Sequence, residues 1–305
     1  MSEKILEYSE LHFSRNSMAA NFFALGKNYR RKDFLSHRKY GAEPYDYLFA
    51  LDLATRCSNA TNCFCFEAMS EGASGNEKAS AQILSAASVS SYICQLMVSA
   101  QGLIWRSEDL SARILARSIS EACDYSIALQ FDEQLAETYV SSSRNFRQVW
   151  YEHFRSEKIQ KARNRALKLM FGEDTSIVTQ VHEYKKSEGE IFSEAVHPSY
   201  YSGFAYLFSG DLSGYDGPEW EFAKRWPHSR VVASIVDSTN LQISTLLLNS
   251  LSERDGWLRV PIVEKSFFKF DRAAIESLLN FTMLATSFIS QSHLLYPEEE
   301  CGSDY

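Results

Sequence analysis

Residues 111–129 read Ser-Ala-Arg-Ile-Leu-Ala-Arg-Ser-Ile-Ser-Glu-Ala-Cys-Asp-Tyr-Ser-Ile-Ala-Leu, and this stretch decides the fold class. On a helix of 3.6 residues per turn, one arc holds the mostly apolar residues Ile114, Leu115, Ile119, Ala122, Tyr125 and Leu129. The opposite arc holds Arg113, Arg117, Ser120, Glu121 and Asp124. The pattern predicts an amphipathic helix that packs one face on a core and turns the other to solvent or into a cleft.

The same three- and four-residue spacing recurs along most of the chain. It predicts helices over residues 2–25, 45–69, 78–106, 108–131, 134–171, 176–192, 230–251 and 267–295. Only 13 Gly and 6 Pro occur in 305 residues, so turns are few and helices long. We therefore predict an all-α bundle of about eight to ten helices with short connections.

Other segments complete the expected organisation. Loops are expected at residues 71–75 and 209–218, and Gly172 is expected to cap the helix before it. Residues 257–263 are the single candidate for a short extended segment, since Pro261 excludes a central strand. We expect an N-terminal helical region (1–75) packed on the main bundle (76–295), and an acidic flexible tail (296–305).

Composition narrows the class of protein. Apolar residues make up 45% and charged residues 23%, which is typical of a globular chain and not a disordered one. The net charge of -8 argues against a protein that coats duplex DNA. No signal peptide is expected, and polar residues interrupt every apolar segment before the roughly 18 residues that span a membrane. These features favour a soluble, cytoplasmic protein with no membrane partner.

Six cysteines are too few for a disulfide scaffold, so reduced thiols are expected. Cys57, Cys63 and Cys65 do not have the usual zinc-ligand spacing, and no metal or cofactor is expected. Phosphate-binding glycine loops, a serine nucleophile elbow and a His-Glu-x-x-His motif do not occur in the sequence.

Two interpretations fit the polar arc of residues 111–129. Arg117 and Glu121 are four residues apart and can pair on a solvated face. Alternatively the arc faces a cleft, where Arg117 is an anion clamp held by Glu121 or Asp124.

A family resemblance bears on this choice. The run Arg117-Ser-Ile-Ser-Glu-Ala122 resembles the Arg-Ser-x-x-Glu-Ala signature of a bacterial helical-bundle family of unknown function, in which a later His-Pro-Ser segment follows. Here that segment is His197-Pro-Ser199, and the resemblance covers residues 81–208. It implies a helical bundle, and it adds His197 to Arg117, Glu121 and Asp124 as candidate residues of a small-molecule or nucleotide pocket. A capping or packing role for His197 at a helix boundary is the alternative.

Residues 144–168 carry eight Lys and Arg against two Glu, a net charge of +6 in an acidic chain. The candidate basic patch comprises Arg144, Arg155, Lys158, Lys161 and Arg165. A local excess of positive charge in an acidic chain is typical of a surface that binds RNA or an acidic partner. A solvated face without a ligand is the alternative. Phe146, Trp150 and Phe154 are interleaved at helical spacing, which is typical of core packing.

The same segment holds Arg147-x5-His153, and a second match joins Arg31 to His37. The pattern resembles the Arg-x4-6-His motif of helical ribonucleases of the HEPN superfamily, although chance alone accounts for about one such match in this composition. The resemblance implies a dimer whose Arg147 holds the phosphate while His153 acts as acid or base, in a metal-independent endoribonuclease that serves as a toxin or anti-phage effector.

Two function classes follow. The first is a protein- or ligand-binding module of a bacterial multi-gene system, with a protein partner or a second copy of itself. The second is the HEPN-like ribonuclease. Whether the protein is an enzyme is left open by the sequence.

Overall fold

A computed structural model describes residues 43–74, 80–105, 109–142, 146–172, 176–196, 229–251 and 272–295. Every regular element in these ranges is an α-helix, which confirms the predicted all-α class. The described helices are α4 (Glu43–Ser74), α5 (Ala81–Trp105), α6 (Asp109–Phe131), α7 (Glu133–Ser141), α8 (Phe146–His153), α9 (Ser156–Phe171), α10 (Ser176–Val196), α13 (Ser229–Leu251) and α14 (Arg272–Leu295).

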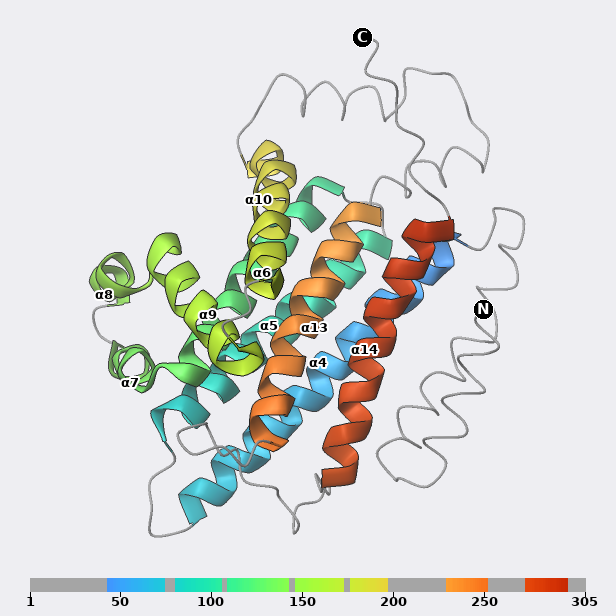
Figure 1. Cartoon of the computed structure of the whole chain (residues 1–305). Coiled ribbons are helices and arrows are strands. Elements are labelled where there is room, and N and C mark those ends of the chain that lie inside the picture. The colour runs from blue at the N-terminus through green and yellow to red at the C-terminus, as the bar shows by residue number, and fades with distance from the viewer. Residues whose placement is uncertain are drawn as a thin grey trace.

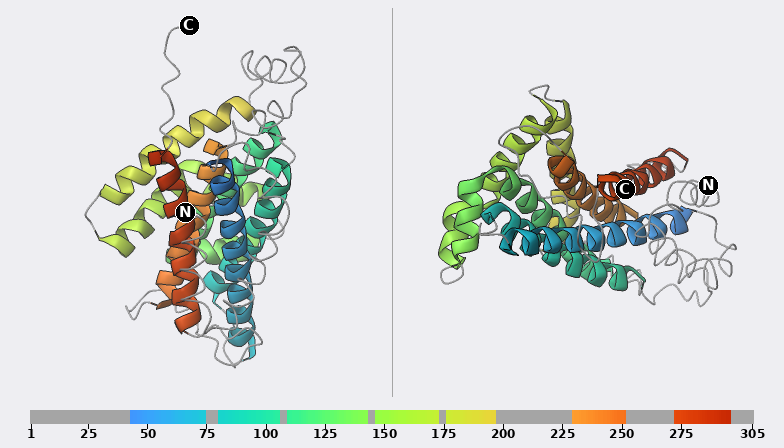
Figure 2. Two further views of the ribbon diagram at one scale, coloured as in Figure 1. Left: turned by 90° about the vertical axis from the view of Figure 1, so that its right-hand side faces the viewer. Right: turned by 90° about the horizontal axis from the view of Figure 1, so that it is seen from below.

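The long helices α4, α5, α6, α13 and α14 form a bundle, and α7 to α10 lie along one side of it (Figures 1 and 2). Helix α6 packs against α5 and α13 in the bundle and against α7, α9 and α10 on the side. It is therefore enclosed over most of its circumference, and this position decides which of its side chains meet solvent.

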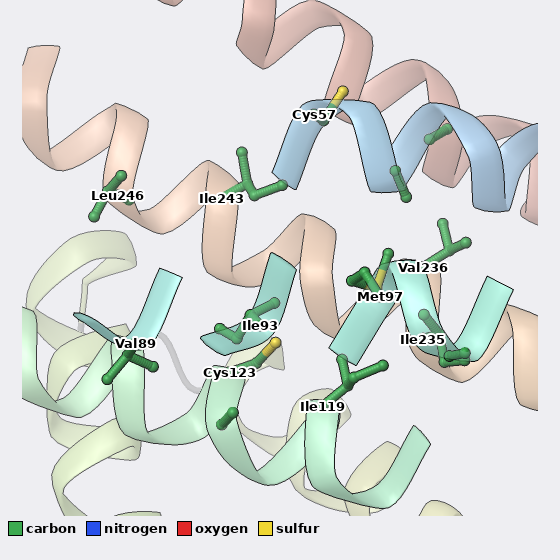
Figure 3. Packing of buried hydrophobic residues seen from close by; sticks show 14 of the residues in the cluster. Cys57, Val89, Ile93, Met97, Ile119, Cys123, Ile235, Val236, Ile243 and Leu246 are labelled. Atoms are coloured by element: carbon green, nitrogen blue, oxygen red, sulfur yellow. The ribbon is translucent and has the colours of Figure 1, made fainter. Parts of the chain in front are cut away.

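The core is formed by apolar side chains from nearly all of these helices. Figure 3 shows Ile93 and Met97 of α5 packed among Ile119 of α6 and Ile243 of α13. Helix α4 contributes to the same core, with Leu51 fully buried. A smaller cluster under α9 consists of Ile127, Ala166 and Leu167.

Contrary to the expectation that polar residues interrupt every apolar segment too early, α5 and α13 are long and apolar enough to cross a membrane by length and composition alone. Buried helices of a water-soluble bundle satisfy the same criterion. In α13, 78% of the apolar window is inside the fold, whereas in α5 the share is 50%. Core packing therefore accounts for the apolar character of α13 in particular.

One predicted helix is wrong. The segment 134–171 was expected to be continuous, but it forms α7, α8 and α9. Asp132 caps α7 by accepting a hydrogen bond from the backbone N–H of Leu135, at 3.0 Å. Between α8 and α9 the ring of Phe154 is buried, and its carbonyl accepts a 2.8 Å hydrogen bond from the Tyr125 hydroxyl. The break between α8 and α9 therefore coincides with a contact to α6 that the local periodicity does not reveal.

The loop predicted at residues 71–75 is also wrong in part, because α4 continues through Gly72 to Ser74. A glycine costs about 1 kcal/mol in a helix and does not end it by itself. The cap at Gly172 is confirmed: its φ is 91°, and its N–H donates to the carbonyl of Lys168. The predictions at residues 2–25, 209–218, 257–263 and 296–305 lie outside the described residues.

Candidate functional site

The polar arc predicted for α6 does not form a single face. Ile114, placed on the apolar arc, is 43% exposed, while Ser120 and Asp124, placed on the polar arc, are buried. The reason is the enclosure of α6: α9, α10 and α13 cover the side from which Ser120 and Asp124 project.

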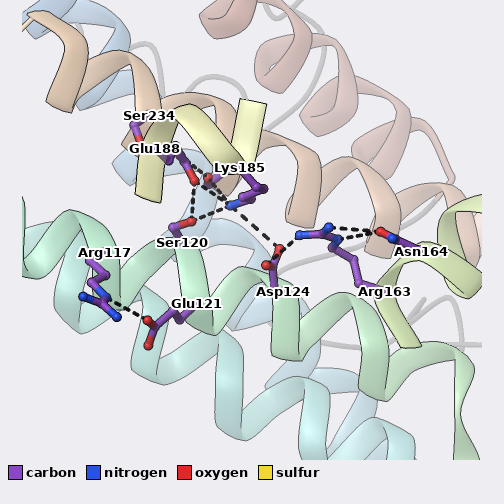
Figure 4. A network of polar contacts seen from close by, with 10 residues as sticks. Arg117, Ser120, Glu121, Asp124, Arg163, Asn164, Lys185, Glu188 and Ser234 are labelled. Carbon is purple, nitrogen blue, oxygen red and sulfur yellow. Dashed lines mark hydrogen bonds and ion pairs between the residues drawn. The ribbon is translucent and has the colours of Figure 1, made fainter. Parts of the chain in front are cut away.

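The structure separates the candidate binding residues of the sequence. Arg117 and Glu121 pair through a 2.9 Å contact between Nε and Oε1 on an exposed part of α6. Asp124 instead points into the bundle, away from this pair (Figure 4). His197 lies outside the described residues. A shared pocket of these four residues therefore remains a prediction, and Asp124 is engaged elsewhere.

The centre of the buried polar region is Glu188 of α10. Its Oε2 accepts a hydrogen bond from Ser120 of α6 at 2.7 Å, and its Oε1 accepts from Ser238 of α13 at 3.1 Å. Ser234 of α13 also donates to Oε1. The Lys185 ammonium lies 3.1 Å from Glu188 Oε2 and donates to the hydroxyls of Ser120 and Ser238. Both charges are thus paired and hydrogen-bonded, as burial requires.

A second buried pair continues this region toward α9. The guanidinium of Arg163, with no exposed surface, donates from Nη1 to Oδ2 of Asp124 at 2.8 Å. Its Nε and Nη2 donate to Oδ1 of Asn164. Lys185 Nζ lies 3.7 Å from Oδ1 of Asp124 and joins the two pairs. We call Asp124, Arg163, Lys185, Glu188 and the three serines the ionic network (Figure 4).

The network contains two carboxylates and two cations, so its formal charges balance. Burial opposes the charged ammonium of Lys185, but Asp124 and Glu188 outweigh it, so the pKa of Lys185 is raised. Beside the network, burial raises the pKa of Asp237 from 3.8 to about 7, and the nearby charge of Glu188 adds to the effect. Burial likewise raises the pKa of the Tyr184 hydroxyl, which hydrogen-bonds Asp237.

This arrangement favours a structural role over a catalytic one. A lysine can activate a serine only as the neutral amine, whereas the raised pKa keeps Lys185 protonated. The hydroxyls of Ser120, Ser234 and Ser238 already donate to a carboxylate. The ionic network instead ties α6, α9, α10 and α13 together.

Sequence reasoning missed most of the ionic network, although one signal was present. Arg163 lies among Ile159, Ala166 and Leu167 at spacings of three and four residues, so it falls on the apolar arc of α9. A cation at such a position requires a buried partner. The identity of that partner depends on which helix packs there.

Three cations of α9 and the arginine at its N-cap point away from the core. Arg155, Lys158, Lys161 and Arg165 are all exposed, and we call them the basic face. Among the described residues, Arg165 lies 3.8 Å from the carboxylate of Asp132, and Lys158 donates to the backbone carbonyl of Glu152. Arg144, also predicted for this patch, lies outside the described residues.

The two residues of the ribonuclease hypothesis, Arg147 and His153, are both exposed on α8. Six residues apart at about 100° per residue, their side chains leave the helix about 120° apart. His153 Nε2 lies 3.8 Å from Oε2 of Glu152. The two side chains therefore do not share one face of α8, and any common site would need a further element.

The described cysteines are free, and burial raises the pKa of Cys57, Cys65 and Cys123 to about 12. No group of three or more metal-ligating side chains occurs among the residues that the structure describes.

Comparison with protein-family models, curated proteins and solved structures found no match for this chain. The resemblances to the Arg-Ser-x-x-Glu-Ala family and to HEPN ribonucleases accordingly remain predictions.

Proposed function

We propose that this protein is a non-enzymatic binding module that engages an anionic partner through the basic face of α9. The observation that carries the proposal is the sorting of charge on this helix. Arg163 is turned inward and neutralised by Asp124, whereas Arg155, Lys158, Lys161 and Arg165 are turned to solvent. In a chain of net charge -8, such a local cluster provides the attraction that an anionic partner needs.

The character of the ionic network supports the non-enzymatic part of the proposal. Its two carboxylates are each paired with a cation, and Lys185 is held in the protonated form. A buried, balanced network of this kind fixes the helices that it joins relative to one another. It therefore holds α9, which carries most of the basic face, rigidly against the bundle.

Retention on a heparin resin at neutral pH tests the proposal. We expect the wild-type protein to bind despite its net negative charge and to elute as salt rises, because exposed charges are screened. A triple variant, Lys158→Gln, Lys161→Gln and Arg165→Gln, should pass through. The matched control is Arg272→Gln, which removes an exposed arginine of α14 that pairs with Glu276 of the same helix. Equal retention of the triple variant and the wild type would refute the proposal.

The second candidate function is the HEPN-like endoribonuclease with Arg147 and His153. Its support is the exposure of both residues on α8, immediately before the basic face. Total RNA from cells expressing the wild type or His153→Ala separates the candidates. Fragmented RNA with the wild type and intact RNA with the variant would establish the ribonuclease; intact RNA in both favours the binding module.

A further inference from the structure

The basic face is a single row, and its shape selects among anionic partners. Lys158, Lys161 and Arg165 are three and four residues apart, so they line up along one side of α9. At a rise of 1.5 Å per residue, successive members are separated by about 4.5 and 6 Å along the helix axis. With Arg155 at the N-cap, four cations extend over about 15 Å.

This charge density suits one strand of phosphates. Duplex DNA carries one negative charge per roughly 1.7 Å of its axis, from two strands that lie on different sides of the helix. Four cations in about 15 Å can neutralise part of one strand only. The negative charge around the row disfavours a duplex, which is wider than one strand. Glu152 and Glu157 are exposed beside the row, and the whole chain carries a charge of -8.

An aromatic ring lies at the beginning of the row. Tyr151 of α8 is 49% exposed, and the guanidinium of Arg155 lies 6.0 Å from the centre of its ring. A phenol ring next to a phosphate-binding cation is the pairing on which an unpaired base stacks. An acidic peptide has no base to place on this ring, and the bases of a duplex are already stacked on one another.

We propose that the basic face, with Tyr151 at its end, binds single-stranded nucleic acid. The inference rests on the proposed function and names the class of partner. Arg155, Lys158, Lys161 and Arg165 contact successive phosphates, and Tyr151 stacks on one base. Because these contacts reach the backbone and the flat surface of a base, binding does not depend on sequence.

Fluorescence anisotropy with labelled probes tests the inference. The probes are an oligouridine and an oligothymidine of about 12 nucleotides, a duplex of the same length and an oligoglutamate peptide. We expect both single strands to bind and the duplex and the peptide to bind more weakly. The two single-stranded probes also distinguish RNA from DNA as the preferred form of the ligand.

The salt dependence gives a quantitative expectation. Four phosphate contacts predict a slope of log K against log salt of about -2.8, which is about a fifty-fold loss of affinity between roughly 50 and 200 mM salt. Lys161→Gln and Arg165→Gln together should reduce the slope to about -1.4. Tyr151→Ala should weaken binding roughly 5- to 150-fold and leave the slope unchanged, because stacking releases no counterions. Arg272→Gln should change neither quantity.

The outcomes separate the two proposals. Tighter binding of the duplex, or a salt slope that Lys161→Gln and Arg165→Gln do not change, overturns the inference about single strands. Binding of the peptide alone overturns that inference but leaves the anionic-partner function standing. If the protein neither binds any probe nor is retained on heparin, both proposals fail. All substituted side chains are exposed, so a circular dichroism spectrum unchanged from wild type shows that the variants are folded.

Discussion

Removing Arg163 should destabilise this fold strongly, because its charge is the close partner of Asp124 in the interior. The side chain of Arg163 has no exposed surface and that of Asp124 is 13% exposed, with 2.8 Å between Nη1 and Oδ2. Among the described residues, Arg163→Met would leave Asp124 with the more distant cation of Lys185, at 3.7 Å. Loss of one partner of a buried ion pair costs about 3–5 kcal/mol, a large part of the roughly 5–15 kcal/mol that stabilises a typical domain.

The double variant should behave differently. When Asp124→Leu is added, both charges are gone, and the remaining Lys185 and Glu188 still balance each other at 3.1 Å. Replacement of a whole buried ion pair by apolar side chains is often close to neutral. We therefore expect the double variant to be more stable than Arg163→Met, with a coupling energy of several kcal/mol between the two positions.

Urea denaturation followed by circular dichroism measures all four members of the cycle. The exposed pair of Arg117 and Glu121 is a matched control, since its 2.9 Å contact has nearly the same length but 42% and 59% of the two side chains are exposed. Its coupling energy should be about 0.3–0.5 kcal/mol. If the coupling energy between Arg163 and Asp124 is no larger than that between Arg117 and Glu121, the argument that burial strengthens the ion pair is refuted.

Three further predictions concern groups outside this pair. Because the pKa of Asp237 is about 7 in the fold and 3.8 in its ordinary state, protonated Asp237 stabilises the protein fully below about pH 4, and this contribution is lost as the pH rises through about 7. Asp237→Asn keeps an acceptor for Tyr184, so it should raise the urea midpoint at about pH 8 and change it little at about pH 4. A larger rise at about pH 4 than at about pH 8 would contradict the argument that burial raises this pKa. Partly buried Cys63 should react with a thiol reagent in the native protein before fully buried Cys57, whose pKa of about 12 suppresses the thiolate. Equal rates would show that the core opens readily. Asp132→Ala removes the cap of α7 and should cost about 1 kcal/mol in urea denaturation, whereas an unchanged midpoint would mean that packing alone holds this helix start.

The ionic network also fixes the position of the helix that carries most of the basic face. Arg163 and most cations of the basic face belong to the same helix, and the inward contact of Arg163 with Asp124 holds α9 against α6. Variants of the exposed row should therefore change binding without changing stability, while variants of Arg163 should change stability first. Measuring both quantities for both kinds of variant separates the binding surface from its support.

The sequence by itself determined the class of fold and most helix positions. Apolar spacing is a property of neighbouring turns, so it identified α4, α5, α6, α10, α13 and α14 to within a few residues. The exposed pair of Arg117 and Glu121 and the cap at Gly172 are equally local, and both are present in the structure.

The positions of the polar side chains of α6 and α9 depend on how the helices pack together. Periodicity divides a helix into two arcs and leaves open whether the polar arc faces solvent or a cleft; because α6 is enclosed by several neighbours, Ser120 and Asp124 meet α10 and α9. The break between α8 and α9 depends on Phe154 reaching Tyr125, 29 residues earlier in the chain. The pairing of Asp124 with Arg163 spans 39 residues. Such contacts depend on which helices lie side by side, and a pattern that repeats within one helix carries no information about its neighbours.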